Sequence, residues 1–313
     1  MSLRIAVLVE TSEIGSPQTD TTFAMLEEAQ RRDMPISVFS SRDLVYDSGD
    51  VFALLRSASV DRSSPEPIFL GTSKWANLKT DADIVLVRKD PPFNMSYITS
   101  TYILEMIIPE TKVINDPRGV RSSPEKILPT LFHDLQPPTV ILKNKDHLRE
   151  FWNKHQDIVI KPLYGYGGQS VLRLREGDQN FDAILEMFDE LSSQPVIGQA
   201  FLPRVSEGDK RIILVGGRPV GAINRKPRAG SIRSNLAVGG VAEATELTPA
   251  EVEICDRIGP ELVKRGLQFV GIDVISGQLT EINVTSPTGA QQIRELSGLD
   301  PVARFFDLLE GVL

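Results

Sequence analysis

The stretch Gly271-Ile-Asp-Val-Ile-Ser-Gly-Gln-Leu-Thr-Glu-Ile-Asn283 has two strand-like runs on either side of a Ser-Gly pair, which predicts a β-hairpin. Glu281 and Asn283 are two residues apart, so their side chains project from one face. A three-residue loop with Gly277 in the left-handed conformation places Asp273 opposite Glu281, whereas a two-residue loop places it on the other face. With the longer loop, the three side chains form a patch of oxygen ligands suited to Mg²⁺ on substrate phosphates. A solvated acidic hairpin is the alternative for this segment alone.

A glycine-rich segment, Lys161-Pro-Leu-Tyr-Gly-Tyr-Gly-Gly-Gln-Ser170, lies between two further strand-like runs. Gly165, Gly167 and Gly168 allow the backbone to approach a phosphate closely, and Lys161 adds a point charge. The segment is not a Walker A motif, in which the lysine follows the glycines. It is not a dinucleotide motif either, because no helix follows. A flap over phosphates and a plain hairpin turn are both compatible with it.

The N-terminal part of the chain predicts an open α/β domain with a mostly parallel sheet. Residues 3–9 form a continuous apolar run, typical of a strand buried on both faces. Residues 21–32 have helical spacing with Asp20 as a candidate N-cap, and a short strand follows at 36–39. This β-α-β order favours a parallel arrangement.

A compact boundary follows this domain. Ser122 and Glu125 match a capping box, and Pro124 suits the first turn of a following helix. We therefore predict an N-terminal domain over residues 1–121 and a second domain over residues 122–313.

Composition narrows the class of protein. The 313 residues suggest about two domains. Lys and Arg total 34 against 42 Asp and Glu, a net charge of −8 that argues against a nucleic-acid partner and a polybasic membrane anchor. Cys255 is the single cysteine, which excludes a disulfide framework or a thiolate zinc cluster within the chain. The N-terminus does not match a signal peptide and no run of about 18 apolar residues occurs, so we expect a cytoplasmic protein with no membrane partner.

Residues 226–240 combine Gly, Ser and Arg without periodicity. This composition is typical of a mobile loop that closes over an anionic ligand, with an ordinary surface loop as the alternative. Further basic residues stand at predicted strand ends, helix starts and loops, where they could hold a triphosphate. They are Lys126, Lys161, Arg211, Arg225, Arg228 and Arg233.

The order of these motifs resembles the ATP-grasp ligases, and within them the bacterial glutathione synthetases, nearly end to end. The motifs that carry the resemblance are Lys126, Ile160-Lys-Pro162 with its glycines, Asp209-Lys-Arg211, Gly271-Ile-Asp273 and Thr280-Glu-Ile-Asn-Val-Thr-Ser-Pro287.

The resemblance implies an α/β fold in which the N-terminal domain precedes a two-lobed α+β ATP-grasp domain, with lobes 122–200 and 201–313. It implies a ligase that joins γ-glutamylcysteine to glycine through an acyl phosphate, releasing ADP and phosphate. It also implies Mg²⁺, with Mn²⁺ as a substitute, and a homotetramer. The alternatives are a related ligase with another amine or acyl substrate, and a regulatory protein that binds ATP without ligation. The paired metal-ligand positions and the arginine-rich loop argue against the regulatory protein.

The resemblance also implies roles for individual residues. For ATP they are Lys126, Lys161, Gly165, Gly167, Gly168, Gln199, Phe201, Leu202 and Asp209. For the metal they are Asp273, Glu281 and Asn283. For catalysis they are Arg211, Arg225 and Asn235. For the substrates they are Arg88, Arg233, Ser286, Pro287 and Thr288.

Three positions depart from the family pattern. Gln18 and Thr19 stand before Asp20 where a lysine is common, and Tyr164 stands in the glycine segment where a small or acidic residue is expected. Gly289-Ala-Gln-Gln292 replaces a common Gly-Ile-Arg-Glu. These positions concern substrate choice, because the phosphate and metal residues are unaffected.

Overall fold

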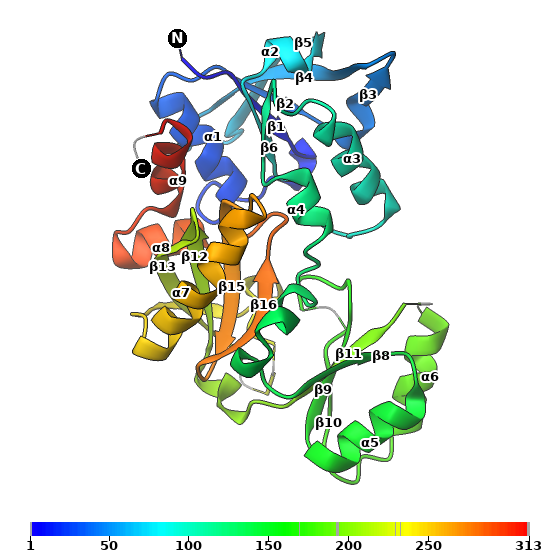
Figure 1. Cartoon of the computed structure of the whole chain (residues 1–313). Coiled ribbons are helices and arrows are strands. Elements are labelled where there is room, and N and C mark those ends of the chain that lie inside the picture. Colours follow the sequence, from blue (N-terminus) through cyan, green and yellow to red (C-terminus); the bar gives the residue numbers. More distant parts are fainter. Residues whose placement is uncertain (1, 169, 192–193, 229, 232, 312–313) are drawn as a thin grey trace.

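The computed structural model describes residues 2–168, 170–191, 194–228, 230–231 and 233–311, and these residues contain three β-sheets (Figure 1). The first sheet belongs to the N-terminal part of the chain. The other two belong to the part that follows. Of the two cavities described below, the first lies between the second and third sheets, and the second is lined by residues of the N-terminal part and of the third sheet.

The N-terminal sheet has the order β3-β4-β2-β1-β6-β7, with β5 paired to β4. Its strands are β1 (Ile5–Leu8), β2 (Ile36–Phe39), β3 (Leu44–Asp47), β4 (Asp50–Val60), β5 (Ile68–Asn77), β6 (Ile84–Val87) and β7 (Lys112–Ile114). Its helices are α1 (Thr21–Arg31), α2 (Leu78–Asp81), α3 (Met95–Glu105) and α4 (Pro117–Arg121). As predicted, Asp20 caps α1 by accepting a hydrogen bond of 2.7 Å from the Phe23 backbone N–H.

The prediction of a mostly parallel sheet is wrong for the half of this sheet that contains β3, β4 and β5. Strands β2, β1, β6 and β7 pair in parallel, but β3, β4 and β5 are antiparallel additions. In β4, buried and less buried residues alternate over much of the strand, as suits a strand with one covered face. The sequence interpretation divided this region into short runs and so missed a long hairpin.

The predicted capping box at Ser122 is also wrong. Asp116 caps the short helix α4, and Ser122 ends it, with its hydroxyl donating to Gly119 O at 3.2 Å. Glu125 instead accepts a 2.8 Å hydrogen bond from the Thr285 hydroxyl, far away in sequence. The next element is a 3-10 helix, η3 (Leu128–Leu135).

The second sheet, β10-β9-β11-β8, is antiparallel and is drawn at the lower right of Figure 1 with two helices against it. It contains β8 (Thr139–Leu142), β9 (Ile158–Pro162), β10 (Leu172–Leu174) and β11 (Val196–Ala200), with α5 (Lys145–His155) and α6 (Phe181–Leu191). Trp152 of α5 stacks on Phe181 of α6 with ring centroids 4.6 Å apart. This sheet therefore has its own apolar core.

The third sheet has the order β14-β13-β12-β15-β16 and is antiparallel. Its strands are β12 (Asp209–Val215), β13 (Arg218–Lys226), β14 (Val241–Ala244), β15 (Phe269–Ile275) and β16 (Gln278–Asn283). Its helices are α7 (Pro249–Lys264), α8 (Ala290–Ser297) and α9 (Pro301–Leu309). The remaining 3-10 turns are η1 (Thr11–Glu13), η2 (Ser41–Asp43), η4 (Pro203–Glu207) and η5 (Leu236–Val238).

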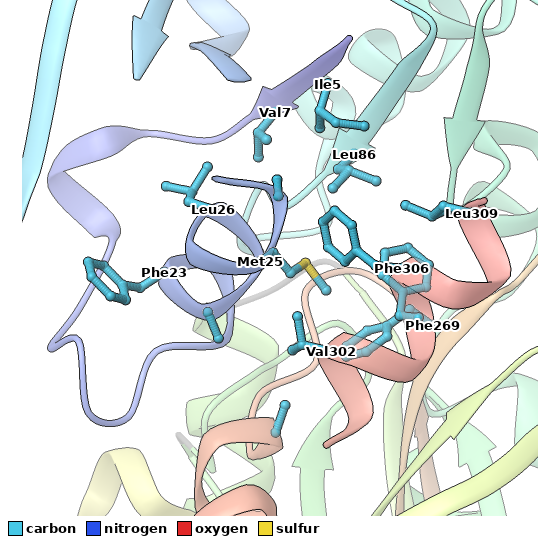
Figure 2. Close-up of a cluster of buried hydrophobic side chains, with 14 of the residues drawn as sticks. Ile5, Val7, Phe23, Met25, Leu26, Leu86, Phe269, Val302, Phe306 and Leu309 are labelled. Carbon is cyan, nitrogen blue, oxygen red and sulfur yellow. The ribbon is translucent and has the colours of Figure 1, made fainter. Parts of the chain in front are cut away.

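The C-terminal helix α9 packs against α1 of the N-terminal domain, and Figure 2 shows the shared core. Met25 of α1 lies there with Phe306 of α9 and Phe269 of β15, all at most 3% exposed. Burying an aromatic or methionine side chain stabilises the folded state by about 1.5–3 kcal/mol. Asn115 adds four hydrogen bonds to the backbone of residues 268, 269 and 284. The N-terminal domain and the third sheet are therefore firmly joined and can line one cavity together.

Two of the departures from the family pattern contact each other across this junction, because the Gln292 side-chain amide donates to Thr19 O at 3.4 Å. Gln291 is buried, and its side-chain N–H groups donate to Pro17 O at 2.6 Å and Asp20 O at 2.8 Å. Its side-chain oxygen accepts from Arg62 and Arg294. Hydrogen bonds thus connect the loop before α1 to the start of α8, and the residues that depart from the family pattern in these two segments lie next to each other.

Candidate active site

The β15–β16 hairpin places Asp273 opposite Glu281, which is the arrangement predicted for a three-residue loop. The loop itself is the shorter one, because Ile275 pairs with Gln278 across Ser276-Gly277. Both loop residues have positive φ, 54° and 73°, as in tight hairpin turns. A β-bulge at Thr280 supplies the extra residue and returns Asp273 to the face of Glu281. The predicted pairing is confirmed, but a bulge rather than a longer loop produces it.

Two buried arginines hold Asp273. Arg211 of β12 donates to both carboxylate oxygens, at 2.6 and 3.1 Å, and Arg225 of β13 lies 3.0 Å away. Burial alone would raise the pKa of Asp273, but the two guanidinium groups outweigh it and hold the pKa well below its ordinary value. Asp273 is therefore ionised throughout the physiological pH range.

Asp209 of β12 forms the other end of this cluster. Its Oδ2 accepts from Arg225 and from the Ser234 hydroxyl, each at 2.6 Å, while its Oδ1 is buried with no hydrogen-bond partner among the residues that the structure describes. Burial raises the pKa of Asp209 to about 6; Arg225 opposes this shift and the negative charge of Asp273 adds to it.

The raised pKa of Asp209 is expected to make stability depend on pH. The folded value is about 6 against a reference of 3.8, so the folded protein gains a proton first as pH falls, and it gains stability from about pH 7 towards pH 4. One pKa unit corresponds to about 1.4 kcal/mol. Urea unfolding should show wild type gaining about 1–2 kcal/mol over Asp209→Asn between about pH 7.5 and pH 5. Identical pH profiles for the two proteins would contradict this.

Two lysines face Glu281, of which Lys126 is buried and Lys161 is largely covered. The Nζ atoms of Lys126 and Lys161 lie 3.6 and 3.8 Å from its Oε1. Lys126 also donates to the Gly165 carbonyl, and Lys161 donates to Gln199 Oε1 at 3.0 Å. Burial lowers the pKa of Lys161, although the nearby Glu281 charge opposes the shift. The arrangement places two cations and one carboxylate under the glycine segment.

The glycine segment needs its glycines at two positions. Gly167 and Gly168 have φ of 63° and 72°, which side chains rarely adopt. A Cβ on Gly168 would also lie 2.6 Å from the side-chain oxygen of Asn235. The segment therefore approaches the 226–240 region closely.

A first cavity lies between the glycine segment and the third sheet. The structure brings all nine residues predicted for ATP together in its lining, with Arg233, Asn235, Asp273 and Glu281. Pro137, Val159, Val171 and Ile275 add an apolar surface that the sequence interpretation missed. A cavity with an apolar part and a cationic part suits a nucleotide, whose base is apolar and whose phosphates are anionic.

A second cavity adjoins the first and shares Gly167, Asn235 and Glu281 with it. Seven of the predicted site residues do not line the first cavity. Six of these seven line the second one, namely Arg211, Arg225, Asn283, Ser286, Pro287 and Thr288. Asp90, Glu125 and Tyr166 line it as well and were missed, because no local motif marks them.

Arg88, the seventh, lines neither of these two cavities. Only 5% exposed, it donates through Nε to the Thr22 hydroxyl at 3.1 Å and through Nη2 to Pro287 O at 3.2 Å. In this structure it supports the loop at Pro287. Tyr164, a departure from the family pattern, stacks against Phe93 with ring centroids 6.2 Å apart.

Solved structures share this architecture. D-cycloserine synthetase DcsG matches with a TM-score of 0.70 and 14% identity, covering 98% of this chain and 99% of that one. The ATP-grasp ligase PsnB in complex with a minimal precursor matches with a TM-score of 0.66 and 17% identity, covering 99% of both chains. The fold is therefore that of the ATP-grasp ligases, with an additional N-terminal α/β domain.

Sequence relatives narrow the class to one family. The model for the N-terminal domain of prokaryotic glutathione synthetase matches residues 3–121, and the model for its ATP-grasp domain matches residues 125–298. Glutathione synthetase of Mesorhizobium japonicum is 47% identical over 311 residues, and that of Salmonella typhi 41% over 313, each with 99% of both chains covered. The chain belongs to the prokaryotic glutathione synthetase family and is an ATP-dependent ligase. The expected resemblance is confirmed, and the non-catalytic alternative is not favoured. Among the helices described, none combines the length and apolar character that a membrane crossing needs.

Proposed function

We propose that this ligase joins the cysteinyl carboxylate of γ-glutamylcysteine to the amine of glycine, using ATP. The observation that carries the proposal is the pair of adjoining cavities, which share Glu281 and Asn235. One has the lining expected for a nucleotide, and the other has two arginines and the segment Ser286–Thr288 expected for the substrates.

In the first cavity, Lys126 and Lys161 would bind the phosphates, with the backbone N–H groups of the glycine segment above them. Gln199, Phe201 and Leu202 would contact the adenine. Asp209 would accept a hydrogen bond from the ribose through Oδ1, which is buried and has no partner in the described part of the chain. An unpaired buried acceptor is costly, so a hydroxyl donor at this position would stabilise the complex.

Asp273, Glu281 and Asn283 fit a divalent ion by the chemistry of their donor set, which is two carboxylates and an amide. Asn283 would bind the ion through its amide oxygen, and its amide nitrogen is buried with no hydrogen-bond partner among the described residues. Among the described residues no cluster of three His, Cys, Asp or Glu could hold a metal alone. Mg²⁺, which is usually bound by one or two carboxylates together with substrate phosphates, therefore fits best, with Mn²⁺ as a substitute. When bound, the ion would neutralise phosphate charge.

The reaction requires positioning and charge stabilisation rather than a protein nucleophile. The substrate carboxylate attacks the γ-phosphorus of ATP, giving an acyl phosphate and ADP; the glycine amine then attacks the acyl carbon, and phosphate leaves. Arg211 and Arg225 would stabilise the negative charge that develops in both steps, with Asn235 as a hydrogen-bond donor beside them. Asp273 keeps both guanidinium groups in place, which preorganises the site.

Residues 226–240 would close over the site and exclude water, which would otherwise hydrolyse the acyl phosphate. Two contacts in this region support the idea. Ser234 donates to Asp209 in the first cavity, and Arg228 donates to Gly239 O at 2.9 Å across the base of the loop. Arg233 lines the first cavity and would meet bound phosphates.

The experiment is a panel of amines assayed for ADP release with ATP and γ-glutamylcysteine. Release should require glycine. Release with β-alanine or serine but not with glycine would overturn the choice of acceptor and favour a related ligase. Release without any amine would point to hydrolysis instead of ligation.

We also propose a cytoplasmic enzyme and a domain boundary after residue 121, both from the sequence itself. From the family resemblance we propose a homotetramer and ATP-grasp lobes 122–200 and 201–313. Light scattering of the purified protein tests the tetramer, and limited proteolysis tests the boundary.

A further inference from the structure

Two carboxylates in the second cavity, Asp90 and Glu125, have no role in the reaction described above, and Glu125 is engaged by the Thr285 hydroxyl. Asp90 follows β6, in the loop that leads to α3, and lines the cavity from the N-terminal domain. Its carboxylate accepts a hydrogen bond from the Ser286 hydroxyl. The side chain is exposed to the cavity, so one oxygen remains available to a ligand.

The cations next to Asp90 in sequence are directed elsewhere. Arg88 donates to Thr22 and to Pro287 O, and the Lys89 ammonium donates to the Ser41 hydroxyl at 2.7 Å. Within the described part of the chain, Asp90 has no ion-pair partner. The buried Arg88 charge attracts Asp90 without forming an ion pair with it, so the free carboxylate oxygen can still accept from a positively charged group on a ligand.

The position of Asp90 indicates which end of the substrate it meets. Ser286 contacts Asp90, whereas Thr288 contacts Arg211 through its carbonyl at 3.1 Å. Ser286 and Thr288 stand two residues apart, so Asp90 and Arg211 are contacted from opposite ends of one short segment of the cavity wall. Arg211 belongs to the end where the substrate carboxylate reacts, so Asp90 marks the other end. A γ-glutamyl dipeptide carries its α-ammonium group at the end opposite its reacting cysteinyl carboxylate.

We propose that Asp90 binds the α-ammonium group of the acyl substrate and thereby selects γ-glutamyl dipeptides over dipeptides that lack this group. Ser286 is the positioning residue, because its hydroxyl orients the Asp90 carboxylate. The inference rests on the proposed function, which places the reacting carboxylate at the Arg211 end.

Two synthetic dipeptides separate the charges on the glutamyl end. Glutaryl-cysteine keeps the α-carboxylate and lacks the ammonium, whereas 4-aminobutyryl-cysteine keeps the ammonium and lacks the carboxylate. With wild type, kcat/KM for glutaryl-cysteine should be about 10- to 100-fold below that for γ-glutamylcysteine, the size of a charge-assisted hydrogen bond.

In Asp90→Asn this discrimination should fall to less than about 3-fold, while discrimination against 4-aminobutyryl-cysteine persists and the KM for ATP is unchanged. Ser286→Ala should reduce the same discrimination in part. Glu13→Gln is the matched control: Glu13 lies near enough to Asp90 to sense its charge, yet does not line the cavity, so the variant should behave as wild type.

Calorimetric binding of the same dipeptides keeps the test independent of turnover. If wild type binds γ-glutamylcysteine but does not join it to glycine, the proposed reaction fails while the role of Asp90 is still measured. The Asp90→Asn variant is first shown to be folded by its thermal transition. The role of Asp90 is overturned if this variant weakens the binding of γ-glutamylcysteine and of glutaryl-cysteine equally, or weakens neither. It is also overturned if wild type binds these two compounds with the same affinity.

Discussion

The Asp273→Asn variant is expected to lose both stability and activity. Asp273 is 3% exposed and is the shared partner of two buried arginines, so neutralising it leaves their charges undercompensated. Breaking such a buried pair costs about 3–5 kcal/mol, which urea unfolding would measure. Turnover should fall by about 10³-fold or more, because Arg211 and Arg225 lose their position and the proposed metal loses a ligand.

Glu281→Gln is the control that separates these two effects. Its carboxylate is more exposed, and its lysine partners lie 3.6 and 3.8 Å away, beyond direct hydrogen-bond distance. We expect a comparable loss of turnover with a change in unfolding free energy of less than about 1 kcal/mol. Normal stability in Asp273→Asn would contradict the structural role of the arginine cluster, and normal turnover in Glu281→Gln would contradict the metal proposal.

The Lys161→Met variant is expected to keep its stability but to bind ATP poorly. Burial lowers the pKa of Lys161, which means that the folded protein holds this charge at a cost. Removing one member of a buried ion pair is destabilising when it leaves the partner charge alone, but Glu281 keeps Lys126 at 3.6 Å in this variant. The free energy of unfolding should therefore stay constant or rise, while the KM for ATP increases by about 100-fold because a phosphate contact is lost.

Thermal or urea unfolding and steady-state kinetics on the same preparation check this pair of outcomes. Lys74→Met is a suitable control, since the Lys74 side chain is exposed and its ion pair is with Asp81, far from the cavities. A Lys161→Met protein that loses stability but binds ATP normally would show that Lys161 serves the fold rather than the nucleotide.

The nucleotide cavity was the most predictable part of the site. Its residues stand in short motifs at strand ends, so strand pairing alone brings them together, as for Lys161 of β9 and Gln199 of β11. The Asp273–Glu281 pair was predicted only as one of two alternatives. No sequence signal distinguished a longer loop from a bulge at Thr280, whose hydroxyl donates to Asp273 O at 3.0 Å.

The substrate cavity was less predictable, because two domains form it. Asp90 reaches the cavity from one domain and Ser286 from the other, a contact that no local spacing encodes. Arg88 was expected at the cavity for its charge, but the same domain junction buries it against Thr22 and Pro287. The capping box at Ser122 failed for a related reason, since Glu125 bonds to Thr285 of the third sheet region.

The most direct test of the proposed chemistry follows one oxygen atom. γ-Glutamylcysteine labelled with ¹⁸O in its cysteinyl carboxylate is incubated with ATP, glycine and the enzyme, and the products are analysed by mass spectrometry. Activation of the carboxylate by phosphorylation predicts one labelled oxygen in the released phosphate for each glutathione formed. Unlabelled phosphate, or ADP formed without glutathione, would contradict the proposal that these two cavities together perform an ATP-dependent ligation.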